Sequence, residues 1–344
     1  MRNATDQLFE CEDQQYSAQI ALATVYTLLC VLGTAANLLV IYLVVSFKKL
    51  RTSSNVFIVN GCGADLLVCA FWMPHEAVLL STHAPLAKGY QAFKEALLFL
   101  GIAVSLLSHS LIAVNRCVLI TKAPATYLSI YQKRNTQGMI VVSWLGPVIM
   151  LPWLSLAGQG CASPRLTAAP FAKRESVLSN PYASATLALT ILAQTVVVLY
   201  CYFKIFRKVQ ISVKRVSVLN FQIVNSLPYA FPRKDKRLGC YVLAVCCVFV
   251  LATVPLFLVL MLRLFGTVPR AAETGSWILF SLLFALNPFL YTWKNEEFRK
   301  SFRCLMRGEI WRGSTVGVEP VVVHTISQPF PKHSGRVAIT GDMN

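Results

Sequence analysis

The sequence predicts an all-α membrane protein: a seven-transmembrane helix bundle, followed by a short amphipathic helix on the cytosolic surface. Of its 344 residues, 56% are hydrophobic and only 14% are charged, and the mean hydropathy is +0.57. A soluble domain carries nearer a quarter charged residues. Seven apolar stretches approach the roughly 20 residues that a helix needs to cross a bilayer. Basic residues also gather in alternate connecting segments.

Seven spans are expected in the order of the chain. They are Ala18–Ser46, Ser54–Leu80, Gln91–Ile120, Gly138–Leu156, Tyr182–Phe206, Leu238–Phe265 and Thr274–Trp293. The fourth is the shortest and contains Pro147 and Pro152. Residues 294–300 are expected to form the amphipathic helix on the membrane surface. The chain then divides into an extracellular N-terminal segment (1–17), the bundle with its surface helix (18–306), and a cytosolic tail (307–344) that we expect to be disordered.

The net charge of +17 does not indicate a nucleic-acid partner, because of where the charges lie. Three basic residues follow span one, and more crowd the segment between spans five and six, whereas four acidic residues precede span one. This is the positive-inside pattern, which places the N-terminus outside and the C-terminus in the cytosol of a multi-pass plasma-membrane protein. No cleavable signal peptide is visible, so span one is expected to direct its own insertion.

Modification signals fit this topology. Asn3-Ala4-Thr5 is a glycosylation sequon on the expected outer side. Of eleven cysteines, nine lie in spans or cytosolic segments, and only Cys11 and Cys161 fall outside. We predict that these two form a disulfide; the alternative is two free thiols. Cys304, in the surface helix, is a candidate for palmitoylation.

Ionisable groups inside a bilayer cost several kcal/mol, so each one is a functional candidate. Asp65 lies in the middle of span two. Together with Asn37, Ser105 and Asn287 it is a candidate for a polar cluster that holds water or a sodium ion. The alternative is a protonated or hydrogen-bonded aspartate with a purely structural role. No other cofactor is expected.

The end of span three carries a second candidate. Arg116, preceded by Asn115, is either a topological charge that snorkels to phosphates or the contact for an intracellular partner, restrained at rest by an acid. Asp235 is a candidate for that acid, or simply one charge in a run of charges. His109, two helical turns before Arg116, is either a satisfied structural histidine or a group whose protonation confers pH sensitivity.

Span seven ends in Asn287-Pro288-Phe-Leu-Tyr291, where the proline frees a backbone carbonyl and lets the helix bend. Such a weak point suits a span that moves. Enzyme signatures are absent from the sequence: there is no nucleophile triad, carboxylate pair, metal-spaced cluster or phosphate loop. Span seven has no lysine between Trp277 and Trp293, which excludes a retinal Schiff base. The lack of internal repeats argues against a transporter.

Taken together, the seven spans, Asp65, Arg116, Trp144, Pro255 and Asn287-Pro-x-x-Tyr291 resemble a rhodopsin-like (class A) G-protein-coupled receptor over about residues 18 to 306. Several stretches resemble the striatum-enriched orphan receptors of that class. They are Phe57–Asp65, Val104–His109, Ala123–Tyr127, Ser212–Asn220 and Tyr291–Arg299. The resemblance implies a receptor that opens a cytosolic cleft to a heterotrimeric G protein of the inhibitory type, which lowers cyclic AMP.

Two other classes of function stay open on the sequence alone. One is a receptor-shaped protein without a diffusible ligand, which acts constitutively or modulates partner receptors in heteromers. The other is a channel or transporter.

Several positions depart from the class pattern. Asn115 replaces the acid before the key arginine, Thr253 replaces the tryptophan two residues before Pro255, and His109 replaces an aliphatic residue. These three changes loosen the resting state, so we expect signalling without ligand. Gln194 replaces the span-five proline, although Tyr202 survives. Gln91 stands in place of the cysteine atop span three, which puts the common disulfide of the class in doubt.

The ligand side is less specific. Leu98 stands where amine receptors carry an aspartate, and it is flanked by Leu97 and Phe99, so a monoamine lacks its counter-ion. His75 and Glu76 in upper span two, with Lys94 and Glu95 in upper span three, either orient a polar ligand head or face water. An apolar or lipid-like ligand fits the Leu- and Phe-rich lining.

Overall fold

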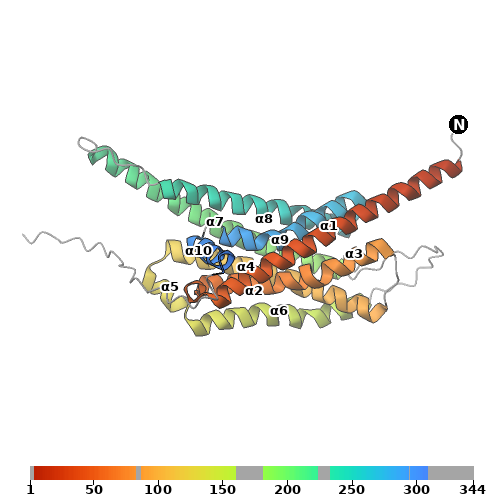
Figure 1. Ribbon diagram of the computed structural model, residues 1–344, viewed down its shortest axis with the longest axis horizontal. Coiled ribbons are helices and arrows are strands. Elements are labelled where there is room, and N and C mark those ends of the chain that lie inside the picture. The colour runs from red at the N-terminus through yellow and green to blue at the C-terminus, as the bar shows by residue number, and fades with distance from the viewer. Residues whose placement is uncertain (1–3, 83–86, 160–180, 224–232, 294, 309–344) are drawn as a thin grey trace, which may run out of the picture. The chain divides into compact units, whose positions relative to one another are not determined.

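The computed structural model describes residues 4–82, 87–159, 181–223, 233–293 and 295–308, which form helices and no strand (Figure 1). The helical bundle belongs to the compact unit Met1–Arg303. Its α-helices are α1 (Ala4–Ser46), α2 (Ser53–Leu66), α3 (Met73–Thr82), α4 (Lys88–Thr121), α5 (Pro124–Ile130), α6 (Lys133–Gln159), α7 (Pro181–Ile223), α8 (Arg233–Phe265), α9 (Arg270–Thr292) and α10 (Glu296–Met306). A short 3-10 helix, η1 (Lys48–Leu50), follows α1, and a π-helical segment, η2 (Leu67–Trp72), joins α2 to α3.

The predicted fold class is confirmed. Within the described residues, six helical segments are long and apolar enough to cross a membrane: Tyr16–Ser46, Ser53–Thr82, Gly89–Thr121, Pro181–Ile211, Tyr241–Phe265 and Arg270–Thr292. The remaining expected span corresponds to α6, a 27-residue helix that contains Pro147 and Pro152 and packs against α2, α4 and α7.

Several boundaries differ from those expected, and the largest difference is at the end of span five, where α7 extends to Ile223 rather than Phe206. The first helix begins at Ala4 rather than Ala18, because the polar residues that precede the apolar run include no proline or glycine to stop a helix. Span two is interrupted by η2 just before Pro74. Proline has no N–H to donate and its ring clashes with the carbonyl four residues earlier, so a widened π turn accommodates it.

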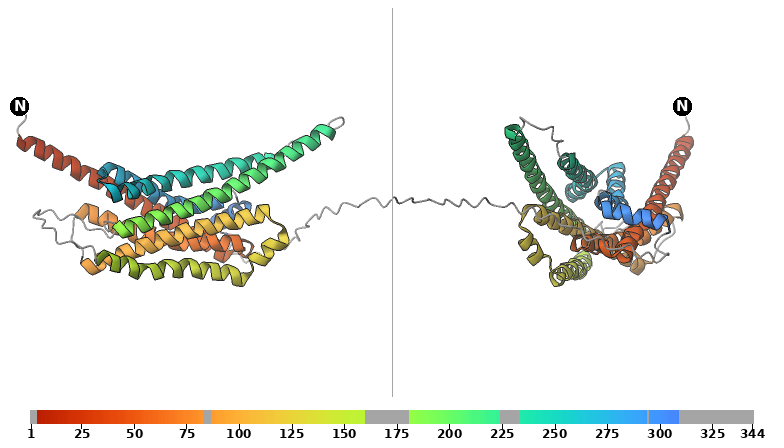
Figure 2. Two further views of the ribbon diagram at one scale, coloured as in Figure 1. Left: turned by 180° about the vertical axis from the view of Figure 1, so that it is seen from behind. Right: turned by 60° about the vertical axis from the view of Figure 1, so that its left-hand side comes forward.

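Helix α4 lies at the centre of the bundle, in contact with α2, α6 and α7 (Figure 1), and the reverse view shows α7 running beside it (Figure 2). The core includes Leu106, Phe249 and Phe284, which are buried. Large apolar side chains on the outer helix faces are exposed, as expected where lipid replaces water.

Two glycines permit close packing of helices. A Cβ on Gly101 of α4 would lie 2.8 Å from Val68 Cγ2, and one on Gly33 of α1 would lie 2.5 Å from Cys69 Sγ. Both Val68 and Cys69 belong to η2. Glycine is therefore required at both positions, because any side chain there would prevent α1 and α4 from packing this closely against span two.

Candidate functional site

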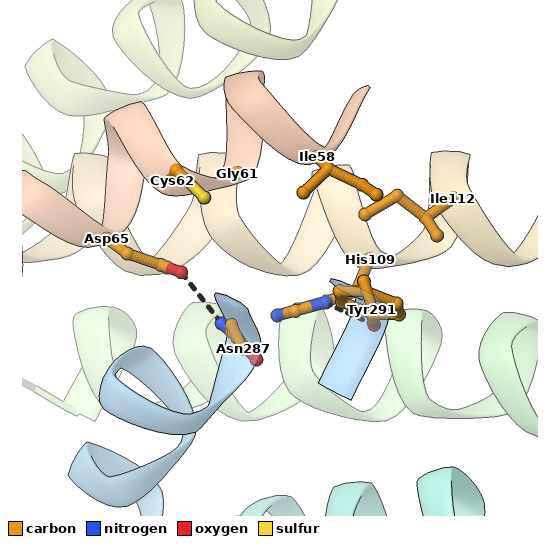
Figure 3. Close-up of a pocket in the computed structure, with 8 residues that line it drawn as sticks. All are labelled: Ile58, Gly61, Cys62, Asp65, His109, Ile112, Asn287 and Tyr291. Carbon is orange, nitrogen blue, oxygen red and sulfur yellow. Dashed lines mark hydrogen bonds between the residues drawn. The ribbon is translucent and has the colours of Figure 1, made fainter. Parts of the chain in front are cut away.

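The carboxylate of Asp65 joins three helices in the middle of the bundle. Its Oδ1 accepts a hydrogen bond of 2.5 Å from Ser105 Oγ on α4. Its Oδ2 accepts one of 2.9 Å from Asn287 Nδ2 on α9 (Figure 3). Asn37 donates instead to the carbonyls of Gly33, at 2.9 Å, and Phe284, at 3.0 Å. Asp65, Ser105 and Asn287 of the expected polar cluster thus contact each other directly. The fourth member, Asn37, instead joins α1 to α9 through the Phe284 carbonyl, three residues before Asn287.

A cavity of about 10 Å³ adjoins this carboxylate, which is room for about one water molecule. It is lined by Ile58, Gly61, Cys62, Asp65, His109, Ile112, Asn287 and Tyr291 (Figure 3). Two atoms on these residues, His109 Nε2 and Asn287 Oδ1, are buried without a hydrogen-bond partner among the described residues. The oxygens of Asp65, Ser105 and Asn287 are the donor type that a hard cation takes, so these residues fit a sodium ion chemically.

His109 connects the cavity to the end of α9. Its Nδ1 lies 2.7 Å from the Tyr291 hydroxyl, and its ring packs edge-on against Phe249, with the ring centroids 5.5 Å apart. The imidazole is buried. His109 therefore makes a polar contact between α4 and α9 where an aliphatic side chain would make none.

Arg116 is held by two tyrosines. Its Nη1 donates to the Tyr241 hydroxyl at 2.9 Å, and its Nη2 donates to the Tyr291 carbonyl at 3.3 Å. The guanidinium also lies over both rings, 5.8 Å and 5.0 Å from their centroids. The Tyr241 hydroxyl in turn donates to the Leu290 carbonyl. We call Arg116, Tyr241 and Tyr291 the tyrosine clamp; it ties α4 to α8 and α9 through neutral partners.

Asn115 points away from the clamp, to other helices. Its Oδ1 accepts from Ser54 Oγ at 2.5 Å, and its Nδ2 donates to the Tyr127 hydroxyl of α5 at 3.3 Å. Tyr131, at the end of α5, packs edge-on against Phe57. Burial, and then the nearby Tyr127, raises the pKa of Tyr131 to about 12, so this phenol is neutral at physiological pH.

The substituted positions on α7 and α8 form interhelical hydrogen bonds. Thr253 accepts from Thr195 Oγ1 at 3.3 Å and donates to the Phe249 carbonyl at 2.7 Å. Gln194 Oε1 accepts from Ser110 Oγ at 2.5 Å. These contacts join α7 to α8 and α4 to α7.

The other predicted site residues occupy several helices. Pro255 and Pro288 lie inside α8 and α9, Leu98 is buried, and Phe99 is half-buried. Tyr202 is buried, and its hydroxyl has no hydrogen-bond partner in the part of the chain that the structure describes. His75 lies beside Glu76 on α3, and Glu76 pairs with Lys94.

Some predictions cannot be compared with the structure. Asn3 and Cys161 lie outside the described residues, as do the side chains of Cys11 and Asp235 and the tail from residue 309. Cys304 is a half-buried cysteine in α10.

Sequence reasoning missed two polar contacts. One is Tyr241, whose hydroxyl accepts a hydrogen bond from Arg116; the side chain of the expected acid, Asp235, lies outside the described residues. The other is Asn60, whose Oδ1 accepts from Trp144 Nε1 at 2.8 Å and whose Nδ2 donates to Ser108 at 2.8 Å and Ser143 at 3.2 Å. An amide in the middle of an apolar span was the available signal for Asn60; Tyr241 has none, since it lies at an ordinary span end.

Comparisons with known proteins agree with the helical fold. The family model "7 transmembrane receptor (rhodopsin family)" matches residues 36–310. The melatonin receptor type 1B-A of Danio rerio is 32% identical over 191 residues, which cover 54% of this chain and 64% of that protein. The melatonin receptor type 1A of Gallus gallus is 29% identical over 188 residues, which cover 54% of this chain and 52% of that protein.

The chain thus spans about half to two thirds of the length of these relatives. The family is one of receptors and not of enzymes, and its members cross the membrane several times. On the family match over most of its length, the chain belongs to the rhodopsin family of seven-transmembrane receptors.

Proposed function

We propose that this protein is a plasma-membrane receptor that activates a heterotrimeric G protein of the inhibitory type, lowers cyclic AMP, and signals to a measurable extent without ligand. The observation that carries the proposal is the tyrosine clamp. A half-buried guanidinium near the end of α4 is held by groups of α8 and α9 that can release it.

Opening of the bundle at this end would begin with the clamp. If α8 moves away from α4, the bonds from Arg116 to Tyr241 and from Tyr241 to Leu290 break together, since both use the same hydroxyl. The freed guanidinium then faces the space that α8 has left. A charged donor in an apolar groove suits a helix that ends in backbone carbonyls and a carboxylate.

The proposed basal activity rests on the neutral hydrogen-bond partners that Arg116 has among the described residues. A hydrogen bond between a charged and a neutral group is weaker than a hydrogen-bonded pair of opposite charges. Asn115 adds no charge to replace the missing acid, and its amide is engaged with Ser54 and Tyr127. A shift of about 1.4 kcal/mol towards the open form raises the ratio of open to closed molecules tenfold.

The remaining features of the proposal rest on the sequence. The charge distribution supports an extracellular N-terminus, glycosylated at Asn3, and a cytosolic tail. The five stretches quoted above support a place among the striatum-enriched orphan receptors. We further propose a small or lipid-like ligand, a sodium ion at Asp65, Ser105 and Asn287, a disulfide between Cys11 and Cys161, palmitoylation of Cys304, and assembly with other receptors as heteromers.

The test is forskolin-stimulated cyclic AMP in cells that express the receptor at a graded series of surface densities. We expect cyclic AMP to fall as density rises, and pertussis toxin, which blocks inhibitory G proteins, to abolish the fall. Arg116→Ala should remove the effect and Asn115→Asp should reduce it, whereas Arg134→Ala, at an exposed arginine at the start of α6, serves as the matched control. Cyclic AMP that is independent of receptor density would contradict basal signalling. An undiminished response in Arg116→Ala would contradict the role of the clamp.

A further inference from the structure

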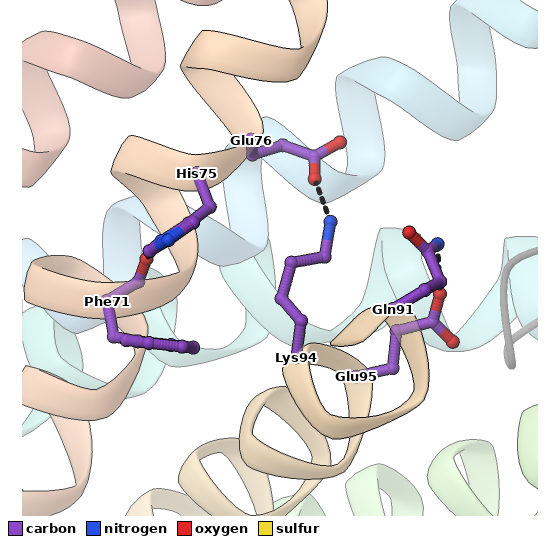
Figure 4. Close-up of polar contacts among 6 residues, drawn as sticks. All are labelled: Phe71, His75, Glu76, Gln91, Lys94 and Glu95. Atoms are coloured by element: carbon purple, nitrogen blue, oxygen red, sulfur yellow. Dashed lines mark hydrogen bonds and ion pairs between the residues drawn. The ribbon is translucent and has the colours of Figure 1, made fainter. Parts of the chain in front are cut away.

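A second polar cluster lies near the other end of α4, about 33 Å from Arg116 at 1.5 Å per residue. Lys94, in the second turn of α4, forms an ion pair with Glu76 of α3, with 3.1 Å between Nζ and Oε2 (Figure 4). Next to it, Gln91 Nε2 donates to Glu95 Oε1 at 2.7 Å. Ionisable groups inside a membrane span mark ligand or ion paths more often than they stabilise the fold.

The π turn of span two positions the acidic partner. The widened turn η2 ends just before Met73, and one extra residue in a turn rotates the next part of the helix by about 100° relative to a regular helix. Beyond it, His75 Nδ1 lies 2.6 Å from the Phe71 carbonyl, and its ring packs near that of Tyr90. Figure 4 shows the Glu76 carboxylate reaching the Lys94 ammonium from the neighbouring helix.

The two partners differ in their access to solvent. The Lys94 side chain is 2% exposed and the Glu76 side chain is 13% exposed. A buried ammonium without a counter-ion is strongly destabilising, so Lys94 requires an anion wherever Glu76 goes. Glu76 lies in the first turn of α3, and its side chain is the more exposed member of the pair. An incoming anion can therefore replace Glu76, whereas an incoming cation would have to expel the buried ammonium.

The surroundings of Lys94 indicate what the rest of such a ligand looks like. Leu98 and Ile102 lie at successive turns on the same face of α4, and both are buried in the apolar core. A ligand whose anionic group lies at Lys94 would thus have the rest of its structure against apolar side chains.

We propose that Lys94 anchors the acidic head group of an amphiphilic ligand, a carboxylate or phosphate that exchanges with Glu76, while the apolar body of the ligand lies towards Leu98. This assignment rests on the proposed receptor function, since it specifies the class of ligand. The ion pair is then a closed state of the binding site, in which Glu76 occupies the place of the ligand.

The test uses the purified full-length receptor in phosphatidylcholine nanodiscs and needs no G protein, so its outcome is independent of the cyclic AMP assay. The midpoint of thermal unfolding is measured with octanoate, octyl phosphate, octylammonium and 1-octanol, which share one chain length. We expect octanoate or octyl phosphate to raise the midpoint, with the stronger of the two identifying the source of the anion, and the cationic and neutral probes to have no comparable effect.

Variants separate binding from structure. Glu76→Gln removes the competing carboxylate, so its midpoint should fall and the anionic probe should restore it at about tenfold lower concentration than the parent requires. The Lys94→Met/Glu76→Gln double variant should not distinguish the head groups. Arg263→Met breaks the more exposed pair Arg263–Glu273 and should keep the parental response. Equal shifts with all four probes, no restoration of Glu76→Gln by anions, or an anion response that persists in the double variant would each overturn the assignment.

Discussion

Replacing Tyr241 by phenylalanine should increase signalling without ligand. The change removes one oxygen, which accepts from Arg116 Nη1 at 2.9 Å and donates to the Leu290 carbonyl, while the ring stays in place beside the guanidinium. The volume of the side chain hardly changes, so the packing of α8 is preserved. The substitution therefore weakens the tyrosine clamp without removing Arg116.

The size of the effect depends on these two bonds. Polar contacts between membrane helices average about 0.6 kcal/mol and reach about 1.7 kcal/mol, and hydrogen bonds to charged groups contribute about 1.5–3 kcal/mol in soluble proteins. Loss of both bonds should favour the open form by about 1.4 kcal/mol, which is a tenfold change in the ratio of open to closed molecules. A receptor that is open about one twentieth of the time would then be open about one third of the time.

The assay is the forskolin-stimulated cyclic AMP response at equal surface expression of the parent, Tyr241→Phe and Tyr200→Phe. Tyr200 is an exposed tyrosine of α7, so it controls for the loss of a hydroxyl elsewhere. We expect a steeper dependence on receptor density for Tyr241→Phe alone. An unchanged or weaker response in this variant would refute the reasoning, because the hydroxyl would then not restrain the closed form.

Three further predictions concern the bundle itself. Gly101→Ala should lower the unfolding midpoint in detergent by the equivalent of about 1–3 kcal/mol, since its Cβ meets Val68 at 2.8 Å, whereas Gly63→Ala, with nothing within 4 Å, should be neutral or slightly stabilising. Asp65→Asn should abolish any stabilisation of the purified receptor by NaCl over choline chloride; retention of that difference would place sodium elsewhere. Asn60→Leu should cost about 2 kcal/mol of unfolding free energy, because three hydrogen bonds to α4 and α6 are lost at about 0.6 kcal/mol each. Trp144→Phe, which removes one of the three, should show a smaller loss in the same unfolding experiment.

The fold was predictable because a bilayer permits few kinds of membrane-spanning structure. Apolar length and the placement of basic residues were enough to predict the helical bundle. The contact among Asp65, Ser105 and Asn287 was also expected, because polar groups in apolar spans are stabilised by hydrogen bonds to each other. The long start of α1 was not, because hydropathy marks where a span can lie and not where a helix begins.

The contacts that depend on register between helices were not predictable. Tyr241 reaches Arg116 only through the relative rotation of α4 and α8, which many packed side chains determine together. Lys94 and Glu76 were visible as charges, but their pairing depends on the π turn before Pro74. Pro74 is visible in the sequence, but the sequence does not show towards which helix the π turn orients Glu76.

Helix α4 runs unbroken from Lys88 to Thr121, with no proline inside it, whereas α6, α8 and α9 each contain at least one. A helix without an internal proline transmits a rotation or an axial shift along its whole length, whereas a helix with one can bend at the proline instead. Lys94 and Arg116 lie on this one helix, so we expect a displacement of α4 at Lys94 to reach Arg116 without passing through any loop.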